Sequence, residues 1–325
     1  DPTFTTAYVT RNFGYMVYDT LFGFDIDGTI KSNMVSNYEV SDDGRHWVFT
    51  LRDDMQFSDG EPVLANDVVA SLKRWTARDN IGAALTEAGG EWKKVDDLTF
   101  ELTLTQPFGL VLDGLAKVSS YPAFILPEKL ASAPTNRPLN DVLGSGPYLF
   151  KRDEWIPGNK VVFEKNPYYK GRGEKAKGLA GDKTSSFERV EWVVLPDSNS
   201  AMAAIQNNEV DLIESVPADY INPMRNNEQV NLGILEQAQA YLVMNQAFPP
   251  FNNLKARLAV AHMIDQNQFT RAMGYPDDMR VPYCETFFIC DSANHTAAGA
   301  VPFRKPNPEK AKALLAESGY NGGKV

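Results

Sequence analysis

The segments that decide the fold are His46-Trp-Val-Phe-Thr-Leu-Arg52, Phe57-Ser-Asp-Gly60 and Asn66-Asp-Val-Val-Ala-Ser-Leu72. In the first, large apolar side chains at 47, 49 and 51 alternate with other residues, which predicts a strand with one buried face. In the last, apolar residues at 68, 69, 72 and 75 recur at helical spacing. Asn66 or Asp67 can cap this helix by accepting hydrogen bonds from free N–H groups of its first turn. A strand, a turn and a helix in succession favour an α/β fold.

Similar patterns continue on both sides of these segments. Turns at Ser41–Gly44, Asp96-Asp97 and Trp155–Gly158 separate alternating runs, which predicts three antiparallel hairpins. We expect a β-α-β unit with parallel strands at 187–195 and 210–213 around a helix at 198–207. The remaining expectations are a strand at 240–245 and helices at 16–24, 108–118, 254–273 and 308–318, the last with Gly319 after its C-terminus.

Length and composition are those of an ordinary globular protein. The chain has 325 residues, of which 43% are hydrophobic and 23% charged, enough for more than one core. The formal charge is -10 and basic residues are scattered, so nucleic acid and anionic lipid are poor partners. Every apolar stretch is well short of the roughly 20 residues that a membrane span requires.

Two cysteines, Cys284 and Cys290, give the one internal indication of the compartment. We favour a local disulfide formed in an oxidising environment. Two buried thiols packed beside Phe287 and Phe288 are the alternative. A metal site with His295 is a weaker alternative, because the spacing departs from the usual Cys-x2-Cys clusters.

Signs of catalysis are lacking in the sequence. His46, His262 and His295 lie far apart, and their neighbours suggest structural roles. Adjacent acidic pairs fall in predicted turns, where Asp bonds its own backbone. Gly-x-Ser-x-Gly and His-Glu-x-x-His motifs do not occur. We therefore expect no catalytic residue, no metal and no cofactor. Aromatic residues in and near loops favour ligand capture; they are Tyr8, Tyr15, Tyr121, Tyr148, Tyr168, Tyr169 and Tyr241.

Several segments in register resemble the family 5 extracellular solute-binding proteins, the dipeptide and oligopeptide type. They span almost the whole chain. Besides the three segments quoted first, they are Val17-Tyr-Asp-Thr-Leu-Phe22, Gly144-Ser-Gly-Pro-Tyr148, Asn166-Pro-Tyr-Tyr169, Ile205-Gln-Asn-Asn-Glu-Val-Asp211 and Pro250-Phe251 to Asp265.

The resemblance implies a two-lobed fold of the class II periplasmic-binding-protein type, with mixed sheets and an extra inserted domain. Domain I would comprise 1–29 and 139–238, domain II would be an insertion at 30–138, and 239–325 would be the incomplete start of domain III. Members are usually longer, so we expect the first strand of domain I to precede Asp1 and the rest of domain III to follow Val325. The chain opens at Asp1-Pro2 without a charged or apolar leader segment, so we expect the signal peptide to be absent from this sequence.

The resemblance also implies a function. A short peptide would be enclosed between the lobes and delivered to the membrane permease of an ABC importer, by a monomeric, non-enzymatic protein in the periplasm or anchored outside the membrane by lipid. The alternative is the same fold with a non-peptide ligand such as a nickel complex, a sugar or an opine. Peptide-type members hold the ligand ammonium with an acidic residue of domain III, which would lie beyond Val325.

Ligand-binding residues are carried over by position. Thr5, Thr6, Ala7 and Tyr8 match the first strand that lines the cleft, and Gly82 and Ala83 match a domain II loop near the ligand. The segment from Tyr241 to Asn245 matches a hinge strand beside the cleft. From it we take Tyr241, Val243 and Asn245 as candidates.

Overall fold

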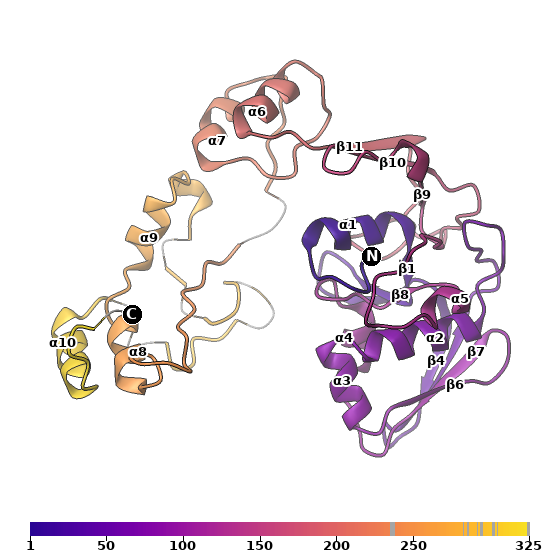
Figure 1. The fold of residues 1–325 in the computed structure, drawn as a ribbon, viewed down its shortest axis with the longest axis horizontal. Coiled ribbons are helices and arrows are strands. Elements are labelled where there is room, and N and C mark those ends of the chain that lie inside the picture. The colour runs from indigo at the N-terminus through magenta and orange to yellow at the C-terminus, as the bar shows by residue number, and fades with distance from the viewer. Residues whose placement is uncertain are drawn as a thin grey trace. The chain divides into compact units, whose positions relative to one another are not determined.

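A computed structural model describes residues 1–234, 238–281, 283–284, 286–290, 292, 295–300, 303 and 305–323. The chain divides into two compact units, Asp1–Val194 (unit 1) and Leu195–Val325 (unit 2). In Figure 1 unit 1 runs from indigo to magenta, and unit 2 continues to yellow. In the described residues no helix is long and apolar enough to cross a bilayer.

A four-stranded antiparallel sheet in unit 1 confirms two of the predicted hairpins. Its strands are β4 (Val35–Val40), β5 (His46–Leu51), β7 (Thr99–Thr103) and β6 (Glu91–Lys94), in the order β4-β5-β7-β6. Phe49 faces Phe100 across the sheet with ring centroids 5.1 Å apart. Asp96 closes the β6–β7 turn by accepting hydrogen bonds from the N–H groups of Leu98 and Thr99.

Helix α2 (Ala65–Thr76) packs on this sheet and confirms the predicted helix. The cap differs from the expectation, because Asp67 accepts from the N–H groups of Leu64 and Glu128 rather than from the first turn. Helices α3 (Asn80–Glu87), α4 (Val111–Ala116) and α5 (Glu128–Ala131) accompany it. The sheet, α2, α3 and α4 share a buried core whose residues lie within 21–125, whereas Ala131 of α5 belongs to a second cluster.

A second apolar cluster joins α1 (Tyr8–Val17) to β9 (Tyr148–Phe150) and β10 (Lys160–Lys165). The helix predicted at 16–24 is wrong beyond Val17. From there the chain forms β1 (Asp19–Thr20), which pairs with β8 (Phe124–Ile125), and β2 (Phe22–Phe24), which pairs with β3 (Ile30–Ser32). Leu21 and Phe22 are fully buried, so this apolar run is enclosed on all sides, which its spacing alone does not distinguish from a helix.

The third hairpin is confirmed, but the parallel β-α-β unit is wrong. Strand β11 (Arg189–Val193) pairs antiparallel with β10, in a sheet ordered β11-β10-β9. After α6 (Ser198–Gln206) residues 210–213 form no strand, and Leu212 is exposed. Strand β11 forms an edge of this sheet and pairs with β10 only.

In unit 2 the described regular structure is helical. The helices are α6, α7 (Ala218–Arg225), α8 (Leu254–Ala261), α9 (Gln266–Ala272) and α10 (Pro308–Glu317), and 3-10 turns occur at η1 (Arg152–Glu154) in unit 1 and η2 (Asp277–Met279) in unit 2. The single helix predicted at 254–273 is broken at His262, because Asp265 caps a new helix at the N–H of Gln268. Gly319 has φ +75°, as the predicted C-terminal cap requires.

Cys284 and Cys290 form a disulfide, with the sulfur atoms 2.04 Å apart. This confirms the favoured interpretation and excludes the two alternatives. His46 lies beside Glu101, and the ring of His262 packs 4.8 Å from that of Phe303, so both have structural partners. The chain end at Lys324-Val325, where we expect a further strand to follow, lies outside the described residues.

Candidate functional site

The predicted residues of unit 1 begin with Thr5, Thr6, Ala7 and Tyr8. The predicted strand is wrong: residues 5–7 have no regular structure, and α1 starts at Tyr8 with Ala7 as its extended N-cap. A strand needs a neighbour to pair with, and none is present beside residues 5–8 in the described part of the chain. Thr6, Ala7 and Tyr8 are exposed, and 68% of the surface of Tyr8 is accessible.

Gly82 and Ala83 lie in helix α3, so the expected loop is also wrong. Asp79 caps the helix by accepting hydrogen bonds from the N–H groups of Ile81 and Gly82, at 2.9 and 3.1 Å. A Cβ added to Gly82 would approach the Cα of Thr76 to 2.6 Å. Gly82 therefore serves close packing of α3 on the end of α2, and Ala83 is the exposed member of the pair.

A network around Arg78 connects these two segments. Its Nη2 donates to the carbonyl oxygen of Phe4 at 2.8 Å, immediately before Thr5. The guanidinium carbon lies 5.0 Å from the ring centroid of Phe4 and 5.5 Å from that of Tyr121, so the cation contacts two aromatic rings. Arg78 immediately precedes Asp79, the N-cap of α3. Its contacts with Phe4 thus attach the exposed segment 5–8 to the start of that helix.

The loop 117–121 completes this surface. Lys117 forms an ion pair with the buried carboxylate of Asp79. The hydroxyl of Tyr15 on α1 donates to the carbonyl oxygen of Val118 at 3.2 Å, and burial raises the pKa of that hydroxyl above its ordinary value, so it is protonated at neutral pH. We call residues 4–8, 78–83 and 117–121 the rim.

Two consecutive residues of the rim have strained backbones. Ser120 and Tyr121 adopt φ angles of +52° and +53°, in the left-handed region that residues other than glycine rarely occupy. Such conformations persist where the surroundings impose them, and they are concentrated at binding and catalytic sites. The hydrogen bonds and ring contacts of the rim supply those constraints.

Sequence reasoning named Tyr121 among the loop aromatics but missed Arg78 and Asp79, which hold the rim together. Asp79 carried a signal, since an Asp before an apolar run is a typical N-cap. Arg78 carried none, because its partners Phe4 and Tyr121 lie 74 and 43 residues away along the chain. Such contacts depend on the route of the chain.

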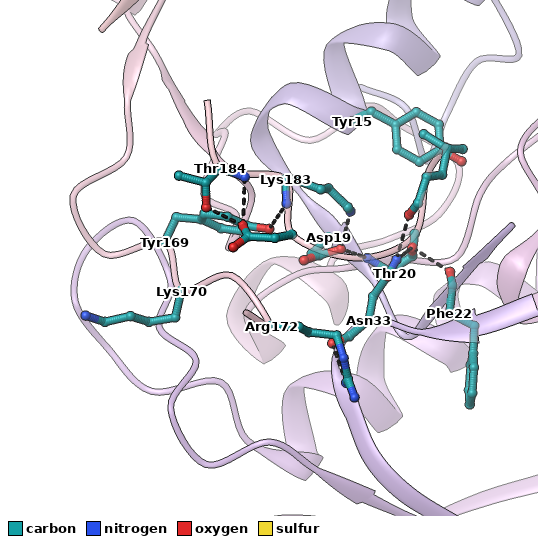
Figure 2. A network of polar contacts seen from close by, with 12 residues as sticks. Tyr15, Asp19, Thr20, Phe22, Asn33, Tyr169, Lys170, Arg172, Lys183 and Thr184 are labelled. Atoms are coloured by element: carbon teal, nitrogen blue, oxygen red, sulfur yellow. Dashed lines mark hydrogen bonds and ion pairs between the residues drawn. The ribbon is translucent and has the colours of Figure 1, made fainter. Parts of the chain in front are cut away.

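A second polar network fixes the loop 166–184 to strands β1–β3. Figure 2 shows Lys183 directed at Asp19, with which it forms a buried ion pair. The backbone N–H of Lys183 donates to the hydroxyl of Tyr169 at 3.1 Å. Arg172 donates to the carbonyl oxygens of Asn33 and Val35, at 3.2 and 2.8 Å. Lys183 and Arg172 are thus both bound to residues of the segment 19–35, so the evident role of the network is to hold the loop.

Tyr241, Val243 and Asn245 belong to unit 2. The predicted strand at 240–245 is wrong, because these residues make no ladder with any described residue. All three are exposed, and Val243 is 86% accessible. Asn245 accepts a hydrogen bond from the N–H of Ala247 at 3.1 Å, and Tyr241 donates to Gln239 at 2.7 Å. A ladder forms only where the N–H and C=O groups of a neighbouring strand are available, and no such strand is present among the described residues.

The chemistry available at the rim is that of binding. It offers exposed hydroxyl and aromatic groups and an arginine whose charge is stabilised by carbonyl and ring contacts. In the described residues, no group of three or more His, Cys, Asp or Glu side chains is arranged to hold a metal ion.

A family model for bacterial extracellular solute-binding proteins, family 5 (middle), matches residues 29–325. The chain belongs to this family.

Its relatives include a probable peptide ABC transporter periplasmic-binding protein of Sinorhizobium fredii, 36% identical over the whole chain and 61% of the relative. A probable D,D-dipeptide-binding periplasmic protein of Escherichia coli is 27% identical over 90% of the chain and 56% of the relative. The chain thus spans about six tenths of the length of these curated relatives.

Solved structures show the same fold. The AgaA binding protein of A. tumefaciens R10, in complex with agropinic acid, has a TM-score of 0.77 and 25% identity, covering 99% of this chain and 62% of that one. The oligopeptide-binding protein AppA of Bacillus subtilis, in complex with a nonapeptide, has a TM-score of 0.78 and 22% identity with the same coverage. The α/β periplasmic-binding-protein fold expected from the sequence is confirmed.

Proposed function

We propose that this chain is the principal part of the peptide-binding component of an ABC importer. The observation that carries the proposal is the 36% identity, over the full length of the chain, to a relative named as a probable peptide transporter binding protein. The rim is consistent with it, because it offers exposed hydroxyl, aromatic and backbone groups without a reactive centre. In this proposal the protein returns its ligand unchanged and is not an enzyme.

The rim is the proposed contribution of unit 1 to ligand binding. Thr5, Thr6, Ala7, Tyr8 and Ala83 would contact the peptide, and Gly82 would allow α3 to approach α2. Tyr241, Val243 and Asn245 are the proposed contribution of unit 2, since their backbone groups have no ladder partner among the described residues. Unpaired backbone groups of this kind can pair with an extended peptide.

The domain division proposed from the sequence has support from packing. One buried cluster draws on residues 21–125, within and just before the proposed domain II at 30–138. The other joins residues around Val17 to residues around Phe163, on both sides of that insertion, and also includes Phe124, Leu126 and Ala131 near its end. Domain I would then be the discontinuous part.

The proposed location is outside the cytoplasmic membrane, with a membrane permease as partner and the binding protein as a monomer. The disulfide supports this location, because such bonds persist in oxidising compartments.

The experiment that tests the proposal identifies the natural ligand. The full-length gene product is expressed in a bacterial periplasm, purified without dialysis and denatured, and the released molecules are identified by mass spectrometry. A set of short peptides is the expected result. One non-peptide compound, such as an opine related to the agropinic acid bound by AgaA, would overturn peptide specificity while leaving solute binding intact.

A pair of matched variants tests the rim. Ala7→Trp places a large side chain on the exposed segment, and the expected result is loss of at least about 90% of the recovered ligand, a factor typical of about 1.4 kcal/mol. Ala176→Trp makes the same change at another exposed alanine of unit 1, and should recover ligand at the level of the unaltered protein. Equal recovery from both variants would contradict the assignment of the rim.

A further inference from the structure

A groove of about 750 Å³ lies in unit 1, outside the rim. Helix α2 contributes Val69 and Lys73 to it, the end of α5 and the following residues contribute Ala131–Thr135, and strand β6 forms another wall. The groove is open to solvent. It shares no residue with the rim and none with the network of Figure 2.

Strand β6 is an edge strand, and all four of its residues line the groove. The sheet order β4-β5-β7-β6 leaves it paired with β7 on one side only. In an antiparallel pair, alternate residues direct their N–H and C=O groups away from the partner strand. Throughout residues 1–234, where every residue is described, no hydrogen bond reaches β6 from the side opposite β7. An extended segment could pair with this edge.

The groove is basic, although the chain carries a formal charge of -10. Four basic residues line it, Lys73, Arg74, Lys93 and Lys94, against two acidic ones, Glu91 and Glu128. Lys93 pairs with Glu91 at 3.0 Å, and Lys94 pairs with Asp97 at 2.6 Å. Exposed pairs of this kind are weak, so the lysines can exchange their partners for carboxylates of an occupant. Lys73 has no ion-pair partner among the described residues.

Two residues of the groove also have donors without acceptors. Arg74 Nη2 and Trp92 Nε1 are buried and make no hydrogen bond within the described chain, although Arg74 Nη2 lies 3.8 Å from the carboxylate of Asp1. Only about 3% of each residue is accessible. Buried donors without a partner are uncommon in folded proteins. The lining of the groove has more basic than acidic side chains, which an acidic occupant would balance.

We propose that the edge of β6 is a docking site for an extended, acidic segment of a partner polypeptide, which adds to the sheet while its carboxylates contact Lys73 and Lys93. Backbone pairing would provide the alignment, and the lysines would select acidic side chains. This inference does not depend on peptide import, because it concerns a surface separate from the rim. The alternative explanation is that the lysines prevent other strands from pairing with this edge.

The test uses the intact protein and a short acetylated and amidated peptide of alternating valine and glutamate. Amide hydrogen exchange is measured with and without the peptide at near-physiological ionic strength. The expected result is protection of amides in Glu91–Lys94, and weaker binding of a peptide in which lysine replaces glutamate. Protection confined to the rim, or absent from β6, would overturn the proposal. Protection at the rim alone would still agree with the proposed function.

Charge reversal separates the groove from general electrostatics. The Lys73→Glu/Lys93→Glu double variant should weaken binding of the acidic peptide by about tenfold or more. The control is Lys31→Glu/Lys170→Glu, which makes the same change of net charge at exposed lysines that do not line the groove. Circular dichroism would verify that both variants fold. Equal weakening by the two double variants would contradict docking at β6.

Discussion

Units 1 and 2 bury their apolar side chains to very different extents. Unit 1 holds all the strands that the structure describes and both clusters of buried apolar residues. In unit 2 the buried apolar residues are mostly alanine and methionine, while Leu212, Val243 and Phe287 are each more than 75% accessible. Unit 1 thus provides partners for its own large side chains, and the described part of unit 2 does so to a much smaller extent.

The difference shows how a pattern becomes a strand. At 46–51 the alternating residues form β5 because β4 and β7 lie on its two sides. At 240–245 a similar pattern forms no ladder, because no neighbouring strand is present among the described residues. Alternation supplies a face to bury, and a pairing partner determines whether the strand forms.

The largest expected effect is on the core of unit 1. Phe49→Ala should lower the free energy of unfolding of unit 1 by about 3–5 kcal/mol, because it leaves a cavity beside Phe100. Phe287→Ala removes a ring that is 77% accessible in unit 2, and should change stability by less than about 0.5 kcal/mol. Urea denaturation measures both. Similar losses would contradict the contrast between the units.

A smaller loss is expected from the buried ion pair of Figure 2. Lys183→Met leaves the carboxylate of Asp19 buried without its cation, which should cost about 3 kcal/mol in unfolding free energy. Lys177→Met is the control: Lys177 pairs with the exposed Asp27, and its second contact, with the buried Asp25, is longer at 3.8 Å. Asp25 keeps the hydrogen bonds from the N–H groups of Asp27 and Thr29, so this change should cost clearly less than Lys183→Met. Adding Asp19→Asn to Lys183→Met should recover part of the loss. Equal costs at the two lysines would show that burial of the pair is unimportant.

The disulfide allows the stability of unit 2 to be changed separately from that of unit 1. Replacing Cys284 and Cys290 by serine should destabilise that unit by roughly 2 kcal/mol, as expected for so short a closed loop, and leave the unfolding of unit 1 unchanged. Chemical denaturation with probes in each unit measures this. Thiol titration of the denatured, unreduced protein should find no free sulfhydryl, and two titratable thiols would contradict the bond.

The smallest effect concerns the turn between β4 and β5. Hydrogen bonds from Ser41 and then Arg45 lower the pKa of Asp43 from 3.8 to about 2. Because this pKa is lower in the folded state, the ionised carboxylate contributes stability above about pH 4, and the contribution is lost as the pH falls toward 2. NMR titration should show the pKa of Asp43 rising in Ser41→Ala. An unchanged value in that variant would exclude Ser41 as the main cause.

Local patterns determined much of the fold of unit 1. Alternation predicted β5 and β7, helical spacing predicted α2, and Asp96 marked a turn that the structure contains. The spacing of apolar residues gave a wrong prediction at 16–24, because a run that is buried on all sides has no distinct period. It failed again at 254–273, where the cap at Asp265 starts a second helix.

The candidate site was predicted only in part. The sequence indicated the exposed segment 5–8 and the neighbourhood of Gly82, but assigned both the wrong secondary structure. It did indicate Tyr121, among the loop aromatics, but not Arg78 or Lys117, whose partners are distant in the chain. The role of Tyr241, Val243 and Asn245 in ligand binding stays a prediction.

The sequence by itself determined the family, the turns and helix ends, and the exclusion of simple catalytic motifs, because each depends on residues close together in the chain. The tertiary structure decided which residues meet, as in the contact of Arg78 with Phe4 and the pairing of Asp19 with Lys183 across 164 residues. It also decided that β6 is an edge. The physical reason is that local propensities act over a few residues, whereas ion pairs, ring contacts and strand pairing depend on the path of the whole chain.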